Sequence, residues 1–328
     1  MTDNRYRRLP VGIQSFKVIR EENYLYVDKS DIVWNMVNLG DKYNYLSRPR
    51  RFGKSVLVDT LEAYLEGRKD LFEGLKIMQI EKDWKQYPVI RLDMSRGGAN
   101  EETLRSYLNL RFKDYEEKYN ITPDPTAMLA DRFHAIIATA YKQTGLRVAV
   151  LIDEYDSPLQ HSWRTPEHEK CTGVYREVFA ILKADDEYEH FVFITGITKF
   201  TQISLFSVLN NLSNISFTPE YAAICGITEE EIEENFMPEI RQMSEANNWS
   251  IQETHDRLKA YYDGYHFSRR NMVDVYNPYS LVNALKSKEI INFWASSGAT
   301  SLLPKFVDNA ELRMKSFENC RIMRNTLE

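Results

Sequence analysis

Residues 47–55 read Ser47-Arg48-Pro49-Arg50-Arg51-Phe52-Gly53-Lys54-Ser55, and the rest of the chain can be interpreted outward from this segment. Its last three residues are the G-K-[ST] end of a Walker A motif. In that motif Gly53 lets the backbone approach a phosphate, Lys54 reaches the β- and γ-phosphates, and the Ser55 hydroxyl ligates Mg²⁺. The segment therefore predicts a loop that binds the phosphates of ATP.

The flanks of this loop favour a strand before it and a helix after it. Residues 43–46 are β-prone, and the apolar residues that follow the loop recur at a helical spacing. The pattern departs from the full motif at Arg48, which stands where the first glycine is usual. The apolar residues are Val56, Leu57, Leu61, Tyr64 and Leu65, and Gly67 is expected to end the helix.

We expect the nucleotide to lie along residues 48–56. Pro49 pushes Arg48 toward an extended backbone, so we expect the Arg48 side chain to point out of the phosphate cradle and its replacement by glycine to be tolerated. Arg50 and Arg51 either contact phosphate or a neighbouring subunit, or face water as charged loops usually do. The full set is Arg48, Pro49, Arg50, Arg51, Phe52, Gly53, Lys54, Ser55 and Val56.

A second motif occupies residues 147–156, which read Arg147-Val148-Ala149-Val150-Leu151-Ile152-Asp153-Glu154-Tyr155-Asp156. The unbroken apolar run predicts a strand buried on both faces of a parallel sheet, and open α/β sheets bind ligands at the carboxyl ends of such strands. This is a Walker B pattern with an added glutamate. We expect Asp153 to hold Mg²⁺ and Glu154 to polarise the attacking water, whereas Asp156 belongs to the turn.

A third apolar run, residues 190–196, has Thr195 near its end. In P-loop ATPases with the added glutamate, a strand lies between the Walker A and Walker B strands and places a polar sensor beside the γ-phosphate. Thr195 is the candidate for this catalytic role, with Thr198 and Lys199 as competitors. The alternative is a threonine that only caps the strand, because threonine is common in strands.

The remaining core pattern alternates strands and helices. Residues 88–95 predict a strand whose Asp93 and Ser95 face the same ligand edge. Residues 24–28 alternate like a strand, and the segments 31–37, 101–119 and 126–142 are predicted helices. The alternation extends to residue 215 and indicates an α/β fold of the P-loop NTPase type, with a doubly wound, mainly parallel sheet.

The segment after residue 215 is predicted to be helical. Residues 228–247 and 251–262 are predicted helices. Thr228 and Glu231 form a capping box at the start of the first, and its acidic first turn is interpreted as solvated, not as a metal site. We therefore divide the chain into a P-loop ATPase core, 1–215, and a helical lid or winged-helix-like region, 216–328. In the lid, His266 is either structural or a sensor of phosphate.

Residues 48–55 resemble the phosphate loop of the bacterial AAA-ATPase-like family, whose members often carry a PD-(D/E)XK nuclease-like domain after the ATPase. The resemblance covers nearly the whole chain and implies that arginine at the first glycine position is normal. The resemblance also implies nucleic acid as a partner. However, we find no D…(D/E)-x-K pair near the end of the chain and expect no nuclease domain. The other similar segments are Leu9-Pro10-Val11-Gly12-Ile13, Tyr26-Val27-Asp28-Lys29-Ser30, Phe206-Ser207-Val208-Leu209-Asn210-Asn211-Leu212, Tyr262-Asp263-Gly264-Tyr265-His266-Phe267 and Val275-Tyr276-Asn277-Pro278.

The amino-acid composition of the chain further limits the class of protein to which it can belong. The 328 residues have 43% hydrophobic content, 27% charged content and a net charge of −6, which does not call for nucleic acid. Three widely spaced cysteines, Cys171, Cys225 and Cys320, suit a reducing compartment. We find no apolar leader and no run long enough to span a membrane, so a cytoplasmic location is expected.

The sequence thus predicts Mg²⁺-dependent ATP binding and hydrolysis that switches a lid. The expected ligands are ATP and Mg²⁺, with Ser55 and Asp153 at the metal and Glu154, Lys54 and Thr195 in catalysis. A protein partner or self-association through the lid is a further expectation. Two alternatives stay open: an ATP-binding scaffold with little turnover, and the ATPase part of a nuclease-linked system that processes nucleic acid.

Overall fold

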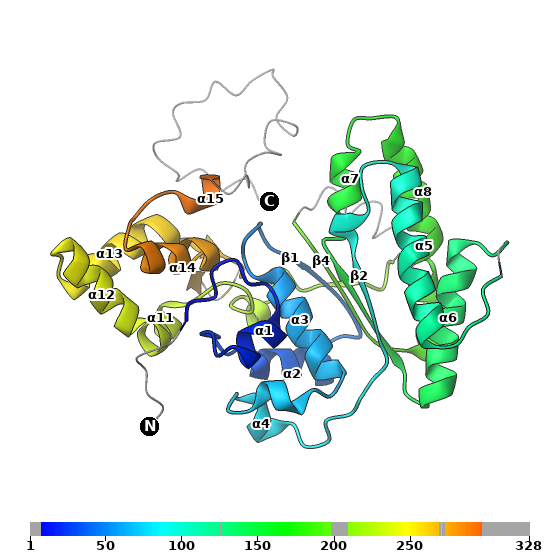
Figure 1. Cartoon of the computed structure of the whole chain (residues 1–328), viewed down its shortest axis with the longest axis horizontal. Helices are drawn as coiled ribbons and strands as arrows, with labels where there is room; N and C mark the ends of the chain where they lie inside the picture. Colours follow the sequence, from blue (N-terminus) through cyan, green and yellow to red (C-terminus); the bar gives the residue numbers. More distant parts are fainter. Residues whose placement is uncertain (1–7, 125, 198–208, 269, 271–272, 297–328) are drawn as a thin grey trace.

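The centre of the protein is a parallel sheet. A computed structural model describes residues 8–124, 126–197, 209–268, 270 and 273–296 (Figure 1). Within these residues the central sheet has five strands in the order β2-β3-β4-β1-β5, and every pairing is parallel. Strand β4 therefore lies between the strand before the loop and the strand that ends in Asp153, as predicted. The strands are β1 (Tyr43–Ser47), β2 (Val89–Asp93), β3 (Val148–Asp153), β4 (Glu189–Gly196) and β5 (Ser213–Asn214).

Strand register brings the polar strand ends to one edge of the sheet. All six residues of β3 are buried, which fits a strand covered on both faces. Asp93 of β2 pairs in register with Asp153, and Leu46 of β1 pairs with Thr195 of β4. The loop after β1 and the carboxylates after β3 consequently lie along the same edge.

Helices cover both faces of this sheet (Figure 1). One face carries α1 (Phe16–Glu21), α2 (Ser30–Asn38), α3 (Lys54–Leu65) and α4 (Ile77–Ile80), and the other carries α5 (Glu101–Lys118), α6 (Leu129–Thr144), α7 (Ser157–His161), α8 (Glu167–Phe179) and α9 (Ile181–Ala184). Each face has its own apolar core, so the fold is the predicted doubly wound α/β arrangement. None of the helices in the described ranges is long and apolar enough to cross a bilayer.

A group of smaller helices, here called the C-terminal unit (residues 216–296), lies beside the α1–α4 layer (Figure 1). Its helices enclose a third apolar cluster, and this cluster includes Leu25 and contacts Val11 from the N-terminal segment. Residues of the segment 9–27 thus pack against the C-terminal unit. The elements are α11 (Glu229–Asn235), α12 (Met237–Asn247), α13 (Ile251–Tyr262), β6 (Tyr265–His266), β7 (Asp274–Val275), α14 (Pro278–Ser287) and α15 (Phe293–Ser296).

Two predicted elements differ from the structure. The helix expected over 228–247 breaks at Phe236, because Pro238 in the first turn of α12 lacks the N–H that would continue α11. The strand expected over 24–28 forms only one bridge, between Tyr24 and Arg8. The segment is held instead by packing of Leu25 into the third cluster.

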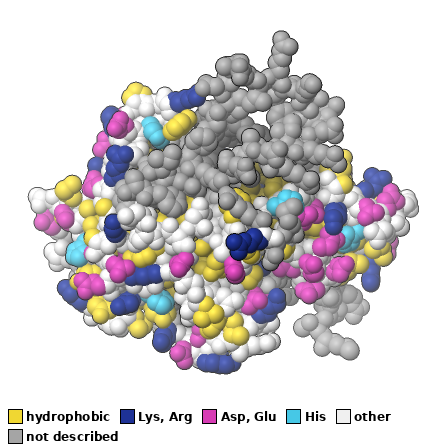
Figure 2. All heavy atoms as spheres, turned by 180° about the vertical axis from the view of Figure 1, so that it is seen from behind, with side chains coloured by type: hydrophobic (Ala, Val, Ile, Leu, Met, Phe, Trp, Pro, Cys, Tyr) yellow, Lys and Arg dark blue, Asp and Glu magenta, His cyan; other side chains and the backbone are white. Residues whose placement is uncertain are grey.

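The acidic side chains in the first turn of α11 form ion pairs that were not expected. The capping box is present, with Glu231 accepting from the Thr228 N–H, but Glu231 also forms an ion pair with Lys29. Glu229 pairs with His255 and Lys259, so the interpretation of a merely solvated turn is wrong for both carboxylates. Figure 2 shows acidic side chains gathered on this side of the molecule, with basic ones among them.

Candidate functional site

The predicted phosphate loop connects β1 to α3. Helix α3 begins at Lys54, and its N-cap is Gly53 with a φ of 84°. That left-handed conformation is accessible to glycine without a Cβ clash. The free N–H groups and positive dipole end of α3 therefore face the loop, an arrangement that favours anions.

Lys54 is buried at the base of the loop. Only 5% of its surface is exposed, and its Nζ donates to the carbonyls of Arg48 and Pro49 at 3.1 Å each. Burial lowers the pKa of the ammonium, while Glu154 and Asp153 act in the opposite direction. A buried ammonium whose hydrogen bonds go to neutral carbonyls can exchange them for the stronger bond to a phosphate oxygen.

The two carboxylates lie beside this lysine. Burial raises the pKa of Asp153, and a hydrogen bond from Ser55 opposes the shift. Burial also raises the pKa of Glu154, opposed mainly by Lys54. Glu154 has a φ of 47°, and its N–H donates to Asp153 Oδ1 at 2.9 Å. A strained backbone at a partly buried acid is a combination found at catalytic positions.

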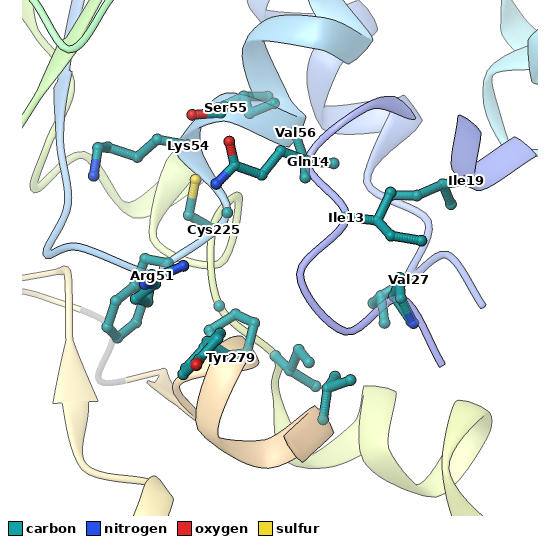
Figure 3. Close-up of a pocket in the computed structure, with 18 of the residues that line it drawn as sticks. Ile13, Gln14, Ile19, Val27, Arg51, Lys54, Ser55, Val56, Cys225 and Tyr279 are labelled. Carbon is teal, nitrogen blue, oxygen red and sulfur yellow. The ribbon is translucent and has the colours of Figure 1, made fainter. Parts of the chain in front are cut away.

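Two cavities adjoin these residues. The larger has a volume of about 470 Å³ and is lined by residues 50–57, Glu154, the N-terminal segment 10–14 and residues 224–227 with α14 (Figure 3). The smaller, about 400 Å³, is lined by Ser55, Asp153 and Glu154 and by the predicted edge residues Asp93 and Ser95, together with Gln14, Ser15, Asp59 and Arg91. Gln14, Ser55 and Glu154 line both cavities.

Some of the residues that line the larger cavity could not be predicted from any sequence motif. Gln14 and Cys225 lie beside Lys54 and Ser55, and Tyr279 lies across from Arg51 (Figure 3). They come from the N-terminal segment and the C-terminal unit, far from the loop in sequence. Only Tyr279 had a usable signal, because the Asn-Pro pair before it starts α14. Of two aromatic residues in the N-terminal segment, Phe16 is fully buried, whereas Tyr26 lines this cavity.

The Arg48 side chain packs against other parts of the fold and lines neither cavity. Its guanidinium donates to Ser216 O at 2.8 Å and Tyr221 O at 2.9 Å and lies 4.0 Å over the Phe267 ring. Only 1% of its surface is exposed, and burial lowers its pKa to about 10. Residues 50–57 line the larger cavity, but Arg48 and Pro49 do not. The Arg48 side chain thus points out of the phosphate loop, as expected, and it satisfies buried carbonyls. That ATP affinity tolerates its replacement by glycine stays a prediction.

The predicted residues near the ends of β3 and β4 also have partners within the fold. Thr195 is fully buried and its hydroxyl donates to Leu46 O at 2.9 Å, which favours the capping interpretation. Its competitors Thr198 and Lys199 lie outside the described residues. Asp156 accepts from the Ile197 N–H at 3.0 Å and so belongs to the turn, as expected. His266 forms an ion pair with Asp274.

The chain is similar to one curated protein in sequence and to a solved structure in fold. The chain is 34% identical over 302 residues to the protein named "Uncharacterized protein in vnfD 5'region" from Azotobacter chroococcum mcd 1, covering 90% of this chain and 55% of that relative. The chain thus spans about half the length of that relative. Among solved structures it is similar to the Aeropyrum pernix ORC2 protein in ADPNP–ADP complexes, with 14% identity, a TM-score of 0.35, and coverage of 88% of this chain and 71% of that one.

A family model described as "Predicted AAA-ATPase" matches residues 10–206, a range that contains the loop, the β3 carboxylates and strand β4. The match covers more than half of the 328 residues. The protein therefore belongs to the predicted AAA-ATPase family.

Proposed function

We propose that this protein binds ATP with Mg²⁺ and hydrolyses it, and that residues 216–328 act as a lid that responds to the nucleotide. The observation that carries the proposal is the convergence of Lys54, Ser55, Asp153 and Glu154 on one sheet edge, next to two cavities with shared lining residues. A cation, a hydroxyl and two carboxylates are the groups that phosphoryl transfer requires. The buried free thiols Cys171 and Cys225 suit work in the reducing cytoplasm.

The donor set at this edge fits magnesium. Mg²⁺ prefers oxygen ligands, and the Ser55 hydroxyl and Asp153 carboxylate supply two of them in hydrogen-bonding contact with each other. When bound, the metal would neutralise charge on the phosphates. Lys54 and the N-terminus of α3 bind the phosphate groups from the loop side.

The far end of the larger cavity suits a base. Val11, Ile13, Val27, Ile227 and Val282 line it and are apolar. A flat, largely apolar ring gains from burial against such side chains. The adenine is therefore assigned to the space between the N-terminal segment and α14, with the phosphates at Lys54.

Glu154 is assigned as the general base. Burial raises its pKa, with Lys54 acting in the opposite direction, and a raised pKa makes it a stronger base than an exposed glutamate. It lines both cavities, so it reaches water on the smaller side and phosphate on the larger. In this role Glu154 takes the proton of the attacking water.

The test is steady-state ATP turnover of the wild type against Glu154→Gln, with and without DNA. The amide keeps the size of the side chain but cannot accept the proton, so turnover should fall at least ~10²-fold while ATP still binds. Glu233→Gln, which changes an exposed glutamate of α11, is the matched control. Equal turnover in wild type and Glu154→Gln would remove the catalytic assignment. Binding without turnover in either would identify an ATP-binding scaffold.

A further inference from the structure

The phosphate loop carries bulky side chains at Arg51 and Phe52, where a Walker A motif leaves the sequence free, and at Arg48, where that motif has its first glycine. Arg48, Arg51 and Phe52 all contact residues of the C-terminal unit, more than 160 positions away in sequence. These contacts are separate from the groups assigned above to phosphate, metal and water. They raise the question of what the loop does besides bind phosphate.

Phe52 and Arg48 share one aromatic partner. The Phe52 ring is fully buried and packs edge-on against Tyr265 at 4.7 Å and Phe267 at 5.5 Å between centroids. The Arg48 guanidinium lies over the same Phe267 ring at 4.0 Å. Such contacts contribute about 0.5–1.5 kcal/mol each beyond apolar burial. Phe267 is therefore held by two loop residues and directly follows β6.

The middle of the loop has two further contacts with the C-terminal unit. Arg51 has a φ of 69°, and its guanidinium lies 4.7 Å over the Tyr279 ring of α14 (Figure 3). The carbonyl of Arg50 accepts from Trp294 Nε1 at 3.2 Å. The loop thus contacts α14, α15 and the β6 segment at once, so its backbone cannot move without disturbing them.

The loop backbone is also tied to the phosphate-binding cation. Lys54 Nζ donates to the carbonyls of Arg48 and Pro49 at 3.1 Å. A phosphate oxygen that accepts from Lys54 would attract the same ammonium that now holds these carbonyls. Arg48 would then transmit any shift of its backbone to Ser216, Tyr221 and Phe267.

We propose that the phosphate loop itself couples nucleotide binding to the C-terminal unit, through Arg48, Arg51 and Phe52. This inference rests on the proposed function, since it needs ATP at the loop. Nucleotide binding shifts the Lys54 hydrogen bonds, the loop side chains follow, and Phe267 passes the change to β6 and α13. A ligand shifts such an equilibrium only through contacts that differ between the two states, and the Lys54 bonds supply that difference.

The test is amide hydrogen exchange of α13, with and without a slowly hydrolysed ATP analogue, in wild type and Phe267→Leu. Helix α13 is the right reporter, because none of its residues lines either cavity and direct contact with nucleotide cannot protect it. In the wild type the analogue should slow exchange of α13 at least ~5-fold. In Phe267→Leu the analogue should still bind within ~10-fold by calorimetry, but slowing in α13 should fall below ~2-fold.

The matched control is Phe133→Leu, an equally buried ring in α6 on the other face of the sheet, where wild-type slowing should persist. Tyr265→Leu, which removes the other ring against Phe52, is the second variant if Phe267→Leu does not fold. Slowing of α13 that survives in both variants overturns the coupling while leaving ATP binding intact. No binding of the analogue by the wild type overturns the proposed function and the coupling together.

Discussion

The two edges of the central sheet both bury carboxylates, yet they are built differently. At the carboxyl edge, Asp153 and Glu154 lie beside Lys54 and line open cavities. At the amino edge, Glu189 is fully buried at the start of β4, 2.7 Å from the Tyr43 hydroxyl. Burial raises the pKa of Glu189 to about 8. Neither cavity includes Glu189 or Tyr43.

This comparison separates a perturbed acid from a functional one. Raised carboxylate pKa values are typical of active sites, but they also occur in structural clusters. At Glu189 the Tyr43 hydroxyl donates to one carboxylate oxygen, and Lys42 and Tyr43 both contact the neighbouring Asp186. At the carboxyl edge, in contrast, a buried cation and a helix N-terminus face open space, and only that combination leaves room for a substrate.

The largest effect should come from Lys54→Ala, which tests the carboxyl edge directly. The phosphates lose a buried point charge, so ATP affinity should fall at least ~10³-fold, about 4 kcal/mol. Titration with a fluorescent nucleotide measures this. A control is Lys42→Ala at the amino edge, where ATP affinity should not change. An unchanged dissociation constant in Lys54→Ala would show that the two edges do not differ in function.

The second largest effect is expected from Arg48→Gly, which should lower the free energy of unfolding. The guanidinium donates to three buried or part-buried carbonyls, and its loss leaves them without this donor. We expect a loss of about 3 kcal/mol in the free energy of unfolding by urea titration, because unsatisfied polar groups cost 1–3 kcal/mol each. Arg48→Lys should restore only part, since an ammonium lacks the planar fork. Full stability of Arg48→Gly would show that these carbonyls do not depend on Arg48.

Glu189→Gln tests the amino edge. The folded pKa of Glu189, about 8, lies above its ordinary value, so the stability that it contributes is present at acid pH and is lost as pH rises through 8. Each pKa unit between the folded and unfolded states is about 1.4 kcal/mol. Allowing for relaxation of the buried site, wild type should lose about 2 kcal/mol relative to Glu189→Gln between about pH 5 and 8.

Urea titrations at both pH values measure this difference, and ATP turnover at neutral pH is the second readout. Turnover of Glu189→Gln should equal that of wild type, because neither cavity includes the residue. A parallel pH dependence in the two proteins would refute the structural account of the amino edge. A loss of ATP turnover in Glu189→Gln would show that the amino edge of the sheet also contributes to activity.

The sequence predicted most of the sheet because its strands carry local signals. The β3 run Val148–Asp153 is apolar throughout, and the order of the loop and this run fixes where Asp153 and Lys54 meet. The place of β4 between β1 and β3 followed from the strand order of P-loop ATPases with the added glutamate, which the two motifs indicated. Helix starts were equally visible where a capping box marks them, as at Thr228.

What the sequence could not predict are contacts between distant segments. Nothing near Arg48 indicates that its partners are Ser216, Tyr221 and Phe267, because those contacts form only after the C-terminal unit packs on the loop. The base end of the larger cavity is similar, since the apolar residues of the N-terminal segment read as ordinary core. Tertiary packing, not local pattern, decides both.

The smallest effect is expected from Thr195→Val, and it decides between the two interpretations of this strand end. Valine has nearly the shape of threonine, so the variant removes the hydroxyl and little else. The hydroxyl donates to Leu46 O inside the sheet, and its loss should lower the free energy of unfolding by about 1 kcal/mol. Turnover should stay within ~3-fold of wild type, because neither cavity includes Thr195.

Thr195→Ser supplies the control, because it keeps the hydroxyl and loses the methyl group. If Thr195 senses the γ-phosphate, turnover must fall at least ~10-fold in the valine variant and recover in the serine variant, while stability changes little. If Thr195 holds β4 to β1, the order reverses, and stability falls while turnover persists. The ratio of the two losses therefore assigns Thr195 to the sheet or to the site.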